Sequence, residues 1–301
     1  MKSWLRRALS LAPALTLIAA FATFGPAQRA AAAPGDLIAE VTTPEGSSLL
    51  WTRAISPSVG FDGHYLYYVE YAGSVLHRVD VPPAGASTAA TGIYDVPIFG
   101  APSGIMSIAY DRGRDVFWAV GGDGVSIYTL TKGGAATLVF RVDALNDRPG
   151  FQVSTYPAEV KLAYDASDDT IWYSPDATTR IYHYLVSPLV TGTRLVPGTP
   201  YVDVDMAAEC GYSQSSGVAV GGSDLFVSIS GCPRYFEFTK TGLKVGSYPM
   251  TAVPSAGDLE CDDVSYAVSV VWVKDQWSGR IQAYEQPASN ACGIGGGASA
   301  R

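Results

Sequence analysis

The sequence predicts an all-β fold, because one pattern of three short strands returns five times along the chain. An apolar first strand ends near an acid or a glycine, at 59–62, 108–111, 162–165, 218–221 and 264–267. An aromatic second strand follows, at 66–69, 116–119, 171–174, 225–228 and 270–273. An amphipathic third strand completes the pattern, at 75–80, 126–131, 180–185, 234–239 and 280–285. A period of about fifty residues with several strands in each unit is typical of a β-propeller.

A fourth strand is expected after the third in four of the repeats, at 91–96, 136–142, 193–196 and 243–250. The fifth repeat lacks one, whereas an additional strand candidate, DLIAEVTT at 36–43, precedes the first repeat. We therefore expect this N-terminal strand to complete the last blade and to close the ring, which removes two exposed sheet edges. Five blades follow from this count. Six blades are the alternative, because 186–217 and 44–58 are long enough to hold further strands.

The first 33 residues are typical of a signal peptide. Lys2, Arg6 and Arg7 precede an apolar stretch at 9–24, and small residues at 30–33 offer a cleavage site. The propeller domain is then expected to span 34–287, with a flexible tail rich in glycine and alanine at 288–301. We expect a monomer that is secreted, to the periplasm or to the medium, with no segment inserted in a membrane.

The acidic composition bears on the partners of the chain. Twenty lysines and arginines stand against 28 acids, so the formal net charge is -8. Such a surface repels phosphate backbones, so we expect no nucleic-acid partner. Cationic ligands or metal ions are favoured instead.

All four cysteines, Cys210, Cys232, Cys261 and Cys292, follow the signal segment. An even number in an exported chain predicts two disulfides. Three pairings exist, and Cys210–Cys232 with Cys261–Cys292 is favoured because each pair closes a short loop within one repeat.

Two stretches carry a family resemblance, GIMSIAYDRGRDVFWAVGGDGVSIYTL at 104–130 and SSGVAVGGSDLFVSISG at 215–231. They resemble the repeats of secreted β-propellers of the NHL, streptogramin-lyase-like and SMP-30/gluconolactonase-like group, over nearly all of the chain after the signal segment. The resemblance implies the fold; lyases, lactonases, scaffolds and adhesins share it. The lactonases use a metal centre of carboxylates and asparagine, whereas this chain has only Asn146 and Asn290. A lyase needs a histidine base, and His77 and His183 occupy equivalent third-strand positions that indicate packing.

Acids are expected at the loops of one propeller face, where they would attract calcium or a cationic ligand. The favoured metal ligands lie beside two cysteines, and they are Glu209, Glu260, Asp262 and Asp263. The expected ligand-binding residues are acids and aromatics of the same loops, namely Glu45, Glu70, Tyr71, Asp123, Asp176, Asp275 and Trp277. The alternative is that these acids are turn residues exposed to water and that the aromatics pack under loops.

The sequence thus favours a secreted, non-catalytic β-propeller that binds a small molecule, a glycan or a protein through an acidic loop face. A metal-dependent, calcium-type hydrolase, lactonase or lyase of the same fold is the alternative. A structural envelope protein without a pocket is the third hypothesis.

Overall fold

The computed structural model describes residues 33–47, 58–143, 159–176, 178–187, 194–211, 215–229, 231–252, 255–275, 278–287 and 292. Met1–Ala31 and Ala32–Arg301 are two separate units, and every described strand belongs to the second. The expected signal peptide lies almost entirely outside the described residues, as does most of the expected tail. Among the described residues, no helix is long and apolar enough to cross a membrane.

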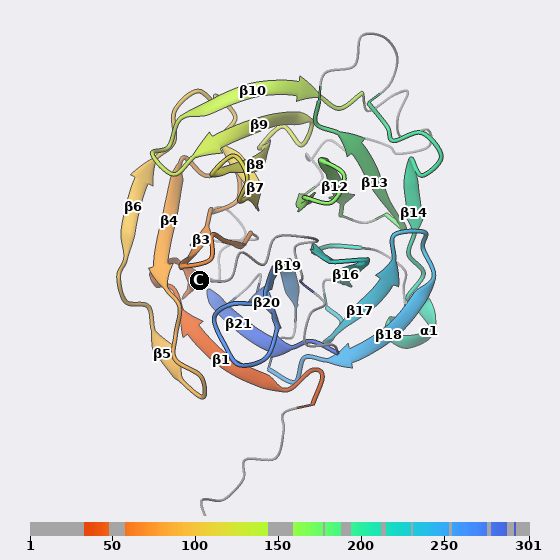
Figure 1. Ribbon diagram of the computed structural model, residues 1–301. Helices are drawn as coiled ribbons and strands as arrows, with labels where there is room; N and C mark the ends of the chain where they lie inside the picture. The colour runs from red at the N-terminus through yellow and green to blue at the C-terminus, as the bar shows by residue number, and fades with distance from the viewer. Residues whose placement is uncertain are drawn as a thin grey trace, which may run out of the picture. The chain divides into compact units, whose positions relative to one another are not determined.

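Five sheets form the blades of a propeller around a central axis, and four of them are entirely antiparallel (Figure 1). The first blade contains β2 (Gly60–Phe61), β3 (Tyr65–Tyr68), β4 (Val75–Asp80) and β6 (Tyr94–Pro97). The second contains β7 (Ile105–Asp111), β8 (Val116–Gly121), β9 (Ser126–Thr131) and β10 (Ala136–Arg141). The third contains β11 (Val160–Asp165), β12 (Thr170–Pro175), β13 (Arg180–Leu185) and β14 (Tyr201–Asp203). The fourth contains β15 (Val218–Gly221), β16 (Asp224–Ser228), β17 (Arg234–Thr239) and β18 (Lys244–Pro249).

The fifth blade confirms the predicted closure of the ring. It contains β19 (Ala256–Asp262), β20 (Val270–Asp275), β21 (Arg280–Glu285), β1 (Leu37–Thr42) and β5 (Ser87–Ala89). The N-terminal strand β1 pairs antiparallel with β21, and β5 then adds to β1 in parallel. Five blades are therefore present, as the repeat count predicts. The short, exposed β5 was not predicted.

Two predicted strands are wrong. The first strand of the fifth repeat is β19, whereas Val264–Ala267 belongs to the turn that follows it. The strand expected at 193–196 contributes only an isolated bridge between Tyr184 and Leu195, and β14 is the fourth strand of that blade. Two short helices, η1 (Pro44–Ser47) and α1 (Ala207–Cys210), lie in connections between blades.

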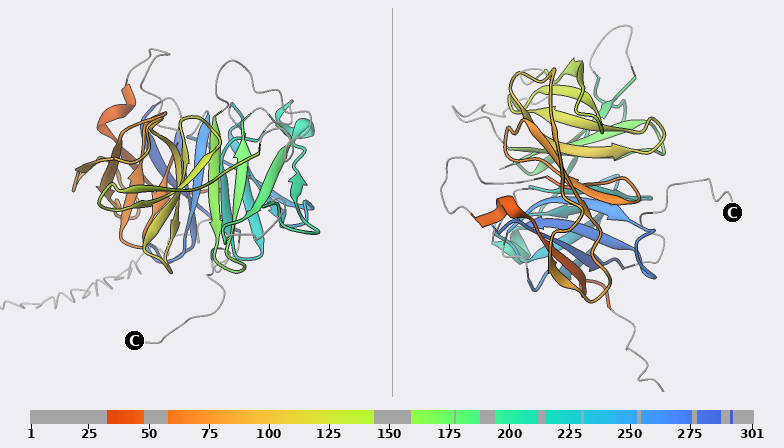
Figure 2. Two further views of the ribbon diagram at one scale, coloured as in Figure 1. Left: turned by 90° about the horizontal axis from the view of Figure 1, so that it is seen from above. Right: turned by 90° about the vertical axis from the view of Figure 1, so that its left-hand side faces the viewer.

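The apolar core lies between the blades. Each pair of neighbouring blades encloses one cluster of buried side chains. Trp118, Trp172 and Trp272 of the aromatic second strands are buried in three of these clusters, so their rings are part of the core between blades. Seen from the side, the blades stand next to one another and their turns form two opposite faces (Figure 2).

An acid at the end of the innermost strand binds the second strand of its own blade. The indole Nε1 groups of Trp118 and Trp272 donate hydrogen bonds to Asp111 and Asp262, at 3.2 and 2.9 Å. Trp172 donates to Asp165 in the same way, at 3.3 Å. In the first blade the hydroxyl of Tyr67 donates to Asp62 instead. The recurring acid therefore joins the first strand of its blade to the second, and its carboxylate oxygens are occupied by these hydrogen bonds.

Two of these acids also form an ion pair with a lysine of the next blade. Lys132 lies 2.8 Å from Asp62, and Lys240 lies 2.5 Å from Asp165. Burial alone raises the pKa of Asp165, but the hydrogen bond and charge of Lys240, with Ser167, outweigh it and hold the pKa below the ordinary value. A carboxylate with a lowered pKa stabilises the fold above its unfolded pKa, and this stabilisation is lost as the pH falls through the folded value.

We expect Lys240→Met to lower the free energy of unfolding at pH 7 by about 2 kcal/mol, because a charged hydrogen bond of Asp165 is lost. The acid-induced loss of stability should then begin at a higher pH than in the wild type, because the pKa of Asp165 rises. Chemical denaturation from pH 7 down to about pH 2 measures both effects. Lys244→Met, which removes a cation from the outer strand β18, is the control; equal pH profiles for the two variants would contradict the assignment.

Candidate ligand-binding site

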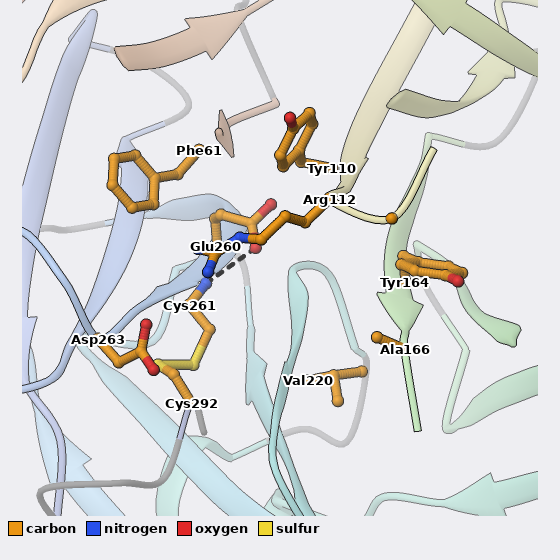
Figure 3. A pocket seen from close by; sticks show the side chains of 11 residues that line it. Phe61, Tyr110, Arg112, Tyr164, Ala166, Val220, Glu260, Cys261, Asp263 and Cys292 are labelled. Carbon is orange, nitrogen blue, oxygen red and sulfur yellow. Dashed lines mark hydrogen bonds between the residues drawn. A yellow bond between two sulfur atoms is a disulfide. The ribbon is translucent and has the colours of Figure 1, made fainter. Parts of the chain in front are cut away.

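The five innermost strands, β2, β7, β11, β15 and β19, contact one another in a ring around the axis. Their C-terminal ends meet at a cavity of about 370 Å³ (Figure 3). The residue before the terminal acid or glycine of each first strand lines this axial pocket, and these residues are Phe61, Tyr110, Tyr164, Val220 and Cys261. The repeat therefore builds the wall of the pocket from one position in every blade.

Turn residues complete the wall of the axial pocket. Arg112 and Gly113 follow β7, Ala166 follows β11, and Asp263 follows β19. Figure 3 shows the side chain of Arg112 extending across the space between the rings. Among the described residues, no carboxylate lies within 4.0 Å of its guanidinium group. A guanidinium without an internal ion pair is available to an anionic or carbonyl group of a ligand.

The two tyrosine rings of the pocket are held by their hydroxyl groups. Tyr110 donates a hydrogen bond to Asp115 at 2.6 Å, and Tyr164 donates to Asp169 at 2.9 Å. Arg114 donates to the Tyr164 oxygen and binds Asp169 with two nitrogens. Burial raises the pKa of both tyrosines, so both hydroxyls are protonated donors. The rings are thus fixed as rigid apolar walls.

Glu260 is one of the two acids that line the described part of the pocket, and the other is Asp263. The carboxyl of Glu260 accepts a hydrogen bond from the backbone N–H of Cys261 at 3.0 Å. Burial raises the pKa of Glu260 to about 8, although backbone N–H groups of Cys261, Tyr110 and Phe61 lower it in part. At neutral pH the group is therefore mainly an uncharged carboxylic acid, which both donates and accepts hydrogen bonds.

A polar contact across the axis closes the centre of the ring. Ser107 of β7 donates a hydrogen bond to Asp258 of β19 at 3.1 Å, although the second and fifth blades are not neighbours. Burial raises the pKa of Asp258, and the charge of the buried Lys161 of β11 lowers it. Lys161 also pairs with Glu159. Three blades thus meet at this axial plug, formed by Ser107, Lys161 and Asp258, and the pocket lies at the opposite ends of the same strands.

The disulfides confirm the favoured pairing. Cys210 bonds to Cys232, and Cys261 bonds to Cys292. The second bond lies in the wall of the axial pocket and fixes Cys292 against β19 (Figure 3).

The four favoured calcium ligands do not share one location. Glu260 and Asp262 lie within β19, and Asp263 follows it, rather than in a loop that precedes the innermost strand. Asp262 accepts hydrogen bonds from Trp272 and from the backbone of Val264 and Ser265, so its oxygens already have partners.

Glu209 lies apart from the other three acids, on α1. It contacts Lys244 and Ser247 of the outer strand β18 and lies 3.4 Å from Arg234. These interactions hold the pKa of Glu209 below its ordinary value. Calcium binding by the four acids stays a prediction, and their placement gives it no common site.

Two of the five expected ligand-binding acids, Asp123 and Asp275, stabilise turns. Asp123 accepts from Ser126 and pairs with Arg141, and the buried Asp275 accepts from Ser278 and pairs with Arg280. Glu70 and Asp176 lie in loops after β3 and β12. Tyr71 is half-buried against the core between the second and third blades. Glu45 contacts the first blade, and Trp277 lies outside the described residues.

The aromatic and basic residues of the axial pocket were not among the predicted site residues. Phe61, Tyr110 and Tyr164 each precede an acid in a strand that looks like ordinary core. Their common register, one residue before the recurring acid, is the signal that locates them on one ring.

Comparisons with known proteins place the chain by fold. No protein-family model and no curated protein sequence matches it. A solved glutaminyl cyclase from Myxococcus xanthus is similar, with 11% identity over 82% of this chain and 97% of that chain and a TM-score of 0.50. A structural genomics protein of unknown function from Bacteroides thetaiotaomicron matches with 13% identity over 76% of this chain and a TM-score of 0.46. The chain spans 58% of the length of that protein.

Virginiamycin B lyase from Staphylococcus aureus is also similar, with 13% identity over 73% of this chain and 62% of that chain and a TM-score of 0.39. The expected resemblance to β-propellers of this broad group is confirmed at the level of the fold, where the match to the glutaminyl cyclase has a TM-score of 0.50. Together with its five sheets, this defines the chain as a five-bladed β-propeller.

Proposed function

We propose that this chain is an exported, non-catalytic β-propeller that binds a small molecule in the axial pocket. The observation that carries the proposal is the convergence of three aromatic rings, the Arg112 guanidinium and the Glu260 carboxyl on one cavity of about 370 Å³. Small-molecule sites are cavities of roughly this size, mainly apolar, with a few polar groups that set orientation. The two disulfides support export to an oxidising compartment.

The chemistry of the lining favours a planar ligand that carries a carboxylate or another anionic group. The rings of Phe61, Tyr110 and Tyr164 offer flat apolar contact. Arg112 offers charged donors, and the protonated Glu260 offers one further donor. These groups come from different blades, so the closed ring has to be intact for binding.

Two observations bear on the competing function, a hydrolase or lyase of the same fold. A metal-dependent enzyme needs three or more ligands at the pocket, whereas Glu260 and Asp263 are the acids that line its described part. A protonated carboxyl with a raised pKa is, however, suited to general acid catalysis. The two functions differ in the fate of the ligand, which a binding protein releases chemically unchanged.

We expect Val220→Trp to abolish ligand binding, because the larger side chain fills the axial pocket. The probes are benzoate and naphthoate, with the corresponding amides as uncharged partners, added to the exported protein. At a hundredfold excess over Kd, binding stabilises by about 2.7 kcal/mol, which raises the melting temperature by about 5 °C or more.

Val245→Trp on the outer strand β18 is the matched control, since Val245 is exposed. Arg112→Ala should weaken the binding of carboxylates and leave that of amides unchanged. Carboxylate binding that survives Val220→Trp would refute this location. If the wild type converts the bound ligand chemically and Glu260→Gln does not, the protein is an enzyme and the proposed non-catalytic function is wrong.

A further inference from the structure

A second polar site lies on the first blade, outside the axial pocket. It joins Glu45 of η1, His77 of β4 and Asp95 of β6. The His77 Nδ1 atom lies 2.9 Å from an Asp95 oxygen and 3.6 Å from a Glu45 oxygen. One ligand atom from each residue lies within 4.8 Å of the other two. In a tetrahedral zinc site with bonds of about 2.0–2.2 Å, ligand atoms lie about 3.4 Å apart. The spacing therefore suits three ligands of one ion.

The imidazole is buried and aimed at the two acids. The His77 side chain is 7% exposed, and its ring stacks on Tyr68 at 4.8 Å with an angle of 14° between the planes. The Tyr68 hydroxyl also donates a hydrogen bond to Glu45. One aromatic side chain thus orients both the nitrogen ligand and one carboxylate, as outer-shell partners do in metal sites.

An ordinary ion pair leaves this cluster incompletely satisfied. Even a protonated imidazolium supplies one positive charge against the two carboxylates of Glu45 and Asp95. If the ring is neutral instead, two carboxylates face each other with no other basic group of the described chain within 4.0 Å. A divalent cation compensates both charges while the ring stays neutral.

We propose that Glu45, His77 and Asp95 bind a divalent transition-metal ion of the zinc class. One imidazole nitrogen with two carboxylate oxygens matches Zn²⁺, whereas Ca²⁺ takes six to eight oxygens. The Asp95 side chain is 53% exposed, so water reaches the remaining coordination position. The ion would join η1, which directly follows the closing strand β1, to the first blade. It would therefore act as a clamp between the two blades on either side of the ring closure.

The chain contains its own control for this site. His183 occupies the equivalent position in the third blade and stacks on Trp172 at 3.8 Å. It lies 3.6 Å from Asp168, but no second carboxylate of the described residues lies within 4.0 Å of it. A lone histidine–carboxylate pair should not hold zinc tightly.

The test is calorimetric titration of the untagged, EDTA-treated and dialysed protein with Zn²⁺, and with Ca²⁺ for comparison. We expect one Zn²⁺ per chain and a rise in melting temperature on loading. Asp95→Asn and Glu45→Gln should each weaken binding at least about tenfold, whereas Asp168→Asn should leave it unchanged. With Co²⁺ as the probe, His77→Gln should alter the visible absorption of the bound ion, which reports the loss of a nitrogen ligand.

Absence of saturable Zn²⁺ binding would overturn the proposal. So would equal affinity in the wild type, Asp95→Asn and Glu45→Gln, because zinc would then be bound elsewhere. Ca²⁺ binding that these two variants abolish, without Zn²⁺ binding, would also overturn the assigned class of metal.

Discussion

Deletion of residues 36–43 is expected to abolish cooperative folding or to lower the melting temperature by more than about 10 °C. These residues form β1, whose Ala39 and Val41 are buried in the core between the fifth and first blades. Their removal opens the edge of β21 and leaves β5 without its partner strand. Circular dichroism melts of the wild type and of the deletion variant measure the effect.

A pair of point substitutions separates loss of the strand from a general effect of shortening. Val41→Asp places an unpaired charge in the core and should cost about 4 kcal/mol or more. Leu37→Asp lies on the same strand at an exposed position and should cost little. A deletion variant that melts like the wild type would show that the ring closes without β1.

Lys161→Met is expected to lower the free energy of unfolding by about 3–5 kcal/mol, because it removes one partner of a buried ionic contact. The ammonium group is buried in the axial plug, where it pairs with Glu159 and stabilises the charged form of Asp258. Without it, Glu159 loses this ion pair and Asp258 loses the charge that lowers its pKa. Urea denaturation at pH 7 measures the difference.

The double variant Glu159→Gln, Lys161→Met should recover part of this loss, because it removes the carboxylate of the ion pair together with its cation. Lys244→Met is the control for loss of a lysine. Lys244 lies on the outer strand β18 and pairs with Glu209 of α1, so its replacement should lower the free energy of unfolding by at most about 1 kcal/mol. If Lys161→Met costs no more than Lys244→Met, the plug does not stabilise the ring.

The sequence allowed the strands, the blade number and the disulfides to be predicted, because each depends on local features. Alternation of apolar and polar residues and the spacing of cysteines are visible without a structure. The innermost strand of the fifth blade was missed because Asp258 and Glu260 interrupt its apolar pattern. Both acids lie on a strand because other blades surround them, Asp258 in the axial plug and Glu260 in the axial pocket.

The axial pocket was missed for a related reason. Phe61, Tyr110 and Tyr164 lie about fifty residues apart and each resembles a core position in its own repeat. Only closure of the ring brings their rings and Arg112 to one cavity. Two of the expected loop acids, Asp123 and Asp275, instead mark turns, because they accept hydrogen bonds from residues that follow closely in the chain.

The pairing of β1 with β21 means that the ring can close only after the fifth blade has been synthesised. Of the strands that the structure describes, β1 is synthesised first, and its partner β21 is synthesised last. Contacts such as Thr43 with Gly279, 236 residues apart, cannot form until the whole domain is available. Such distant pairing carries a large entropic cost and slows folding. β1 must therefore remain unpaired with β21 until the fifth blade has been made.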